Sequence, residues 1–173
     1  SDVCSSDLLA TFLREHGITV DVLDFLHNFT LDELTEILVN IVDQQPEFIA
    51  IGSTLDKKYI LWNSLLLKIK EILPNTKIIV FGERVLRLNY TGADYYIEGF
   101  SETAFLSILQ NQDIRFSEVN NCKFIDTRID YPNNLKANSF AIRNIESDFI
   151  GKKEVHQTMF SQGCIFKCAF CNH

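Results

Sequence analysis

The chain lacks any run of basic residues and any long apolar run. Of its 173 residues, 16 are Lys or Arg and 23 are Asp or Glu, which gives a net charge of −7 and an isoelectric point near 5.0. Domains that bind nucleic acid carry a basic surface, so this charge balance argues against nucleic acid as a partner. No apolar stretch approaches the roughly 18 residues of a membrane span, and no signal peptide is visible. We therefore expect a cytoplasmic protein without a membrane partner.

Cysteine is scarce except at one place. Cys164, Cys168 and Cys171 lie at C-x3-C-x2-C spacing, and the rest of the chain holds only Cys4 and Cys122. An odd cluster in a chain without secretory features does not indicate disulfides. Zinc sites usually show two cysteine or histidine pairs, which are missing here, although zinc with His173 as a fourth ligand is an alternative. Three thiolates on one loop can hold three irons of a 4Fe-4S cluster and leave the fourth iron open, so the spacing favours an iron–sulfur site.

The composition, with 46% apolar residues, is that of a globular protein with room for one domain and part of another. Segments with helical periodicity, bounded by residues that begin or end helices, alternate along the chain with short apolar runs rich in β-branched residues. The expected helices are Leu9–His16, closed by Gly17; one opened by a capping box at Thr30–Glu33 and ended by Pro46; Tyr59–Leu73; and Ser101–Leu109. The expected strands are Ile18–Asp24, Phe48–Gly52, Lys77–Gly82, Ala93–Gly99 and a short Lys123–Ile125.

This alternation predicts an α/β fold with a Rossmann-like, doubly wound parallel sheet. Ligands of such sheets lie beyond the carboxyl ends of the strands. The loops of interest therefore begin at Ser53, at Gly82 and at Glu98. For Ser101 and Glu102 we favour a structural role, with Ser101 as the N-cap of a helix and Glu102 facing its dipole.

The ends of the chain are expected to differ from the body. Residues 1–8 resemble the conceptual translation of a sequencing adapter, so natural sequence is expected to begin near Leu9; a polar segment with a helix cap at Ser6 or Asp7 is the alternative. Residues 113–150 lack periodicity and are assigned to a linker, in which Cys122 is expected to be a buried or surface thiol rather than a metal ligand. Residues 151–173 contain a strand-like segment, in which polar and apolar residues alternate, and this segment leads into the cysteine loop.

The cysteine motif, with Phe170 directly before Cys171 and Gly163 before Cys164, resembles the signature of the radical S-adenosylmethionine (SAM) family. The resemblance implies that the three cysteines hold a 4Fe-4S cluster whose open iron binds SAM, and that Phe170 packs near the adenine. It also implies a β/α barrel, with residues 151–173 as its truncated first strand and cluster loop, an electron donor such as flavodoxin or ferredoxin, and a small-molecule or peptide substrate.

Residues 9–112 resemble the cobalamin-binding domain that precedes many radical SAM barrels. Ser53-Thr54-Leu55 matches its S-x-L element, which implies that Ser53 and Leu55 contact cobalamin. Gly82 matches the first glycine of a pair in that family, and Glu83 replaces the second. The family motif D-x-H-x-x-G does not occur. Such a chain would be a fragment of a longer enzyme and inactive by itself.

Two other functions are compatible with the sequence. One is a non-catalytic Rossmann-like module that binds a nucleotide-like ligand and holds zinc in its cysteine loop. The other is a methylthiotransferase, a family that also places a domain before a radical SAM barrel. That domain contributes three cysteines of its own, whereas Cys122 is the candidate available here.

Overall fold

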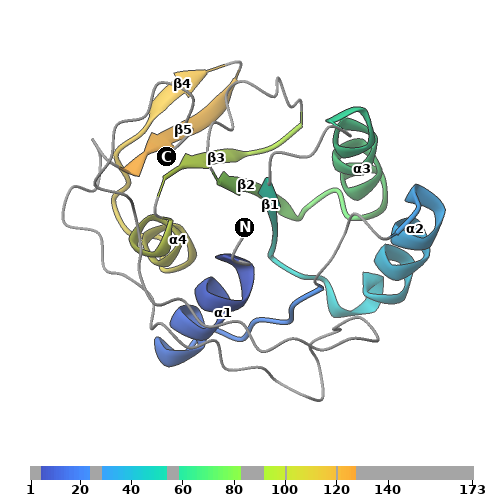
Figure 1. The fold of residues 1–173 in the computed structure, drawn as a ribbon, viewed down its shortest axis with the longest axis horizontal. Helices are drawn as coiled ribbons and strands as arrows, with labels where there is room; N and C mark the ends of the chain where they lie inside the picture. Colours follow the sequence, from blue (N-terminus) through green and yellow to red (C-terminus); the bar gives the residue numbers. More distant parts are fainter. Residues whose placement is uncertain are drawn as a thin grey trace, which may run out of the picture.

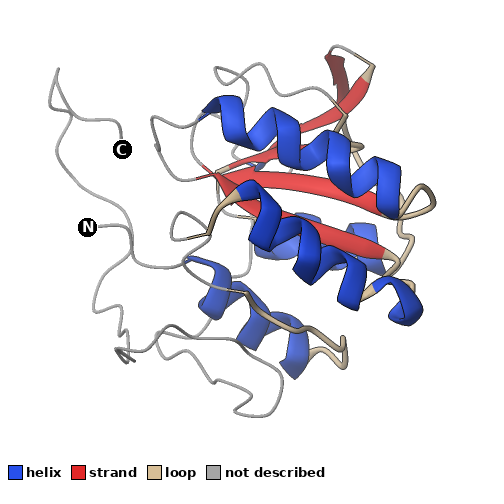
Figure 2. Cartoon of the chain, turned by 90° about the vertical axis from the view of Figure 1, so that its right-hand side faces the viewer, coloured by secondary structure: helices blue, strands red, loops and turns tan. Residues whose placement is uncertain are grey.

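The computed structural model describes residues 5–23, 29–53, 59–82, 92–99, 101–119 and 121–127. They form a five-stranded sheet with helices on both faces (Figures 1 and 2). Across the sheet the strands are β1 (Phe48–Ser53), β2 (Lys77–Gly82), β3 (Tyr95–Glu98), β5 (Cys122–Asp126) and β4 (Ser117–Val119). The first four are parallel and β4 is antiparallel. The predicted α/β class with a mostly parallel sheet is therefore confirmed.

The helices cover the two faces of the sheet in pairs. Helices α1 (Ser5–Glu15) and α4 (Glu102–Leu109) pack on one face, and α2 (Leu31–Asn40) and α3 (Tyr59–Ile72) pack on the other (Figure 1). Strand β2 shows why the side chains on both faces of the sheet are apolar. Its alternating side chains Ile78 and Val80 join the α2–α3 core, while Ile79 and Phe81 join the α1–α4 core, and all four are buried. A parallel strand covered on both sides needs such a continuous apolar run.

The start of α2 is set by the predicted capping box. The Glu33 amide donates to Thr30 Oγ1 at 3.3 Å, and the Thr30 amide donates to Glu33 Oε2 at 2.7 Å. The predicted end at Pro46 is wrong, because the helix ends at Asn40 and a 3-10 turn, η2 (Val42–Gln44), follows it. The tightening from α-helical to 3-10 hydrogen bonds ends the helix before proline can act.

Helix α1 ends as predicted and begins earlier. Gly17 adopts φ +79°, and its amide donates to the Arg14 carbonyl at 3.0 Å, as expected of a glycine that closes a helix. The first turn begins at Ser5, so part of the segment set aside as an adapter translation is helical in the structure. The alternative cap at Ser6 or Asp7 is wrong, because both residues lie inside the helix.

The predicted strand at Ile18–Asp24 does not form in the described residues 18–23. Residues 18–22 belong to no ladder, and Leu23 makes an isolated bridge. One main-chain acceptor there is satisfied by a side chain instead, since Arg14 Nε donates to the Val20 carbonyl at 3.1 Å. A β-branched sequence favours extended backbone, but a strand also needs a neighbour with which to pair.

The far side of the sheet was predicted only in part. The short strand expected at Lys123–Ile125 is confirmed as β5, and its hairpin partner β4 was not predicted. Strand β4 has three residues, two of them exposed, and so carries no alternating pattern. The sheet therefore includes residues that were expected to belong to the 113–150 linker. The other expected elements are confirmed, with small shifts at their ends: α3, α4, β1, β2 and β3.

Candidate functional site

The carboxyl ends of the four parallel strands lie in one row. Ser53 of β1 pairs with Gly82 of β2, Gly82 with Glu98 of β3, and Glu98 with Asp126 of β5. This row is the edge at which ligands of parallel α/β sheets usually bind, because the loops that follow the strands converge there. We call these four residues the carboxyl row.

Gly82 ends β2 in a backbone conformation that favours glycine. Its φ of +134° lies in a region that L residues with a side chain rarely adopt. Its carbonyl accepts from the Gly99 amide at 3.4 Å, and Gly99 itself has φ +97°. A glycine therefore ends β2, and another directly follows β3. Glycine has no Cβ, and it is the residue that lets another group come closest to the main chain.

Two carboxylates lie side by side in the carboxyl row. Glu98 and Asp126 are register partners on β3 and β5, so their side chains leave the same face of the sheet. Thr127, which is buried, holds the two strand ends together by donating its hydroxyl to the Glu98 carbonyl at 3.0 Å. Like charges on paired residues repel. This part of the row therefore favours hydrogen-bond donors or positive charge over phosphate.

The amino end of α4 lies next along the chain. Ser101 occupies the predicted N-cap position and Glu102 the first turn, and both are buried. The Phe105 amide donates to the Ser101 carbonyl at 2.8 Å, which confirms where the helix begins. The Ser101 hydroxyl, however, makes no capping hydrogen bond, and its backbone is already helical. Ser101 is therefore the N-cap residue by position, but its side chain does not cap the helix.

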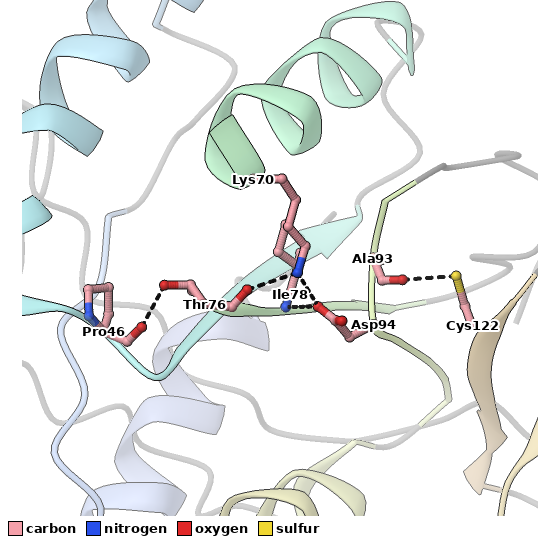
Figure 3. A network of polar contacts seen from close by, with 7 residues as sticks. All are labelled: Pro46, Lys70, Thr76, Ile78, Ala93, Asp94 and Cys122. Carbon is pink, nitrogen blue, oxygen red and sulfur yellow. Dashed lines mark hydrogen bonds and ion pairs between the residues drawn. The ribbon is translucent and has the colours of Figure 1, made fainter. Parts of the chain in front are cut away.

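The opposite, amino-terminal edge of the sheet is held by a polar network (Figure 3). Asp94 Oδ2 accepts from Lys70 Nζ of α3 and from the Ile78 amide of β2, each at 2.7 Å. Lys70 Nζ also donates to the Thr76 carbonyl at 2.9 Å, and the Thr76 hydroxyl donates to the Pro46 carbonyl at 2.7 Å. These contacts set how β1, β2 and β3 lie against one another, and thereby align their carboxyl ends.

Cys122 is part of this structural edge. Its thiol is buried and donates to the Ala93 carbonyl at 2.9 Å (Figure 3). Burial raises the pKa of the Cys122 thiol above its usual value; the hydrogen bond with Tyr96 lowers the pKa, and the nearby charge of Asp94 raises it further. The thiol therefore stays protonated at neutral pH, when a metal ligand would have to be a thiolate. Of the buried or surface thiol that the sequence predicted, the structure shows the buried form.

Of the residues predicted to bind cofactors, the structure describes two and brings them together. Ser53 and Gly82 are paired at the ends of β1 and β2. Leu55 and Phe170 lie outside the described residues, as do Cys164, Cys168, Cys171 and the whole of 151–173. Within the described ranges, no group of three or more His, Cys, Asp or Glu could hold a metal ion.

Sequence reasoning missed Asp126 and Thr127. Both depend on β5, which was expected to be a short strand inside a linker rather than a member of the main sheet. A weak signal was present, because Cys122–Asp126 ends in an acidic residue, as β3 does. Nothing in that pattern specifies β3 as the neighbour of β5, however.

Comparisons with known proteins add no relative. No family model, no curated protein and no solved structure matches the chain. No helix in the described part of the chain is long and apolar enough to cross a membrane.

Proposed function

We propose that this protein is a radical SAM enzyme whose α/β sheet is a Rossmann-like, doubly wound domain of the cobalamin-binding type. The observation that carries the proposal is the C-x3-C-x2-C motif of Cys164, Cys168 and Cys171, with Phe170 in the aromatic position. Three thiolates match the donor set of a 4Fe-4S cluster with one open iron. The rest of the chain supplies no competing cysteine pair, which weakens the zinc alternative.

When bound, such a cluster passes one electron to SAM, which breaks a carbon–sulfur bond and yields methionine and a 5′-deoxyadenosyl radical. The electron comes from a donor such as flavodoxin or ferredoxin. The three cysteines would hold the cluster, and Phe170 would cover the adenine. Hydrogen abstraction from a small-molecule or peptide substrate would follow, with methyl transfer or another radical modification as its result.

Cobalamin is the second cofactor of the proposal, and the carboxyl row supports it. Ser53 and Gly82 are paired there, and Gly82 carries no Cβ. The carboxylates of Glu98 and Asp126 suit the edge of a corrin, whose amide side chains donate hydrogen bonds. Ser53, Leu55 and Gly82 are the residues assigned to hold the cofactor, with Glu98 and Asp126 at its polar rim.

The methylthiotransferase alternative receives no support from Cys122. A cluster ligand must be a thiolate with an open path to iron. The Cys122 thiol is buried, donates to the Ala93 carbonyl and has a raised pKa. Within the described residues, the sheet domain therefore offers no cysteine for a second cluster.

The first experiment tests the cluster. The chain is reconstituted anaerobically with iron and sulfide, and iron content, the visible charge-transfer absorption and the EPR signal of the reduced cluster are measured. We expect about four irons per chain and an EPR signal that changes when SAM is added. Cys164→Ala, Cys168→Ala and Cys171→Ala should each abolish the signal. Cys122→Ala is the matched control and should keep it.

Two results would overturn the cluster assignment. Stoichiometric zinc without the iron spectrum would favour the zinc-binding module. Unchanged iron content in Cys168→Ala would show that the iron lies elsewhere. A cluster that forms but does not respond to SAM would place the chain among other iron–sulfur proteins.

The second experiment tests cobalamin with a pair of glycine variants. Gly82 and Gly92 both have positive φ, +134° and +93°, so alanine strains the backbone at either position. Gly92 precedes β3 at the amino edge of the sheet, away from the carboxyl row. Hydroxocobalamin binding, followed by its absorption change, should weaken about tenfold or more in Gly82→Ala, which corresponds to about 1.4 kcal/mol. Equal weakening in Gly92→Ala would show that only strain was measured.

A further inference from the structure

We draw no further inference here: the strongest candidate, the small apolar cavity beside Trp62 between α3 and strands β1 and β2, leaves no room for a water molecule and lies just below Ser53 and Gly82 of the carboxyl row, so it belongs to the site already described.

Discussion

Removal of the Asp94 carboxylate should destabilise the fold more than its position near the surface suggests. Asp94 Oδ2 is the shared acceptor for Lys70 Nζ and for the Ile78 amide, each at 2.7 Å (Figure 3). The Ile78 side chain is fully buried, at 0% exposure. In Asp94→Ala, the Ile78 amide loses its acceptor at a place where the surrounding core limits access of water.

The magnitude follows from two contributions. An amide left without its acceptor in the interior costs about 1–3 kcal/mol. The ion pair is partly exposed, with side-chain exposures of 31% for Lys70 and 37% for Asp94, so its loss adds at most about 1 kcal/mol. The free energy of unfolding should therefore fall by about 2–4 kcal/mol. For a chain of this size, the midpoint of thermal unfolding should fall by roughly 5–15 °C. Asp94→Asn keeps an acceptor oxygen and should cost about 1 kcal/mol.

Urea unfolding measures this effect, with Trp62 as the probe. Trp62 is the single tryptophan of the chain and is 6% exposed, so its fluorescence reports the packing of α3 on the sheet. The midpoint should shift while the slope with urea concentration stays constant. Glu71→Ala is the control, because it breaks the exposed Lys68–Glu71 pair and should change stability by less than about 0.5 kcal/mol. If Asp94→Ala and Glu71→Ala agree within that margin, the role given to the network is wrong.

Three further changes test the core, a helix cap and a buried thiol. Leu66→Ala should lower the free energy of unfolding, measured with urea, by about 2–5 kcal/mol, whereas Leu67→Ala should lower it by less than about 0.5 kcal/mol. The reason is that Leu66 is 1% exposed and Leu67 is 60% exposed. Equal losses would contradict the assigned buried face of α3. Thr30→Ala should cost about 1 kcal/mol by the same measurement, since it removes the capping box of α2; no loss would show that the main chain suffices. Because folding raises the pKa of the Cys122 thiol, the stability that this group contributes should be full below its unfolded pKa of about 8.5 and should be lost as pH rises through the folded pKa. Cys122→Ala should remove this loss of stability at alkaline pH. An unchanged pH profile in the variant would assign the loss to other groups.

Local signals in the sequence predicted the elements whose formation depends on nearby residues. The capping box at Thr30 and Glu33 acts within one helical turn, and it is present as expected. Lys77–Gly82 was predicted with its observed bounds, because a short apolar run between turn residues indicates a buried strand wherever its neighbours lie. Tyr59–Ile72 was predicted to within one residue for the same reason, since its helical periodicity and the following Pro74 are local features.

The predictions that failed are those that depend on which strands pair with one another. Residues 18–23 have the composition of a strand but lack the ladder that would make them one. Ser117–Val119 has too few residues for a pattern and is a strand because β5 lies beside it. The candidate site shows the same limit. The pairing of Glu98 with Asp126 joins residues far apart in the chain, and no spacing in the sequence indicates it.

By itself, the sequence determined the local features: the helix starts and stops, the apolar strands covered on both faces, and the three-cysteine motif on which the proposed function rests. These follow from hydrogen bonds and side-chain chemistry within a few residues. Only the tertiary structure decided which strands are neighbours, and hence that Ser53, Gly82, Glu98 and Asp126 form one row. Strand order depends on the packing of all the helices against both faces at once, and no local stretch of residues carries that information.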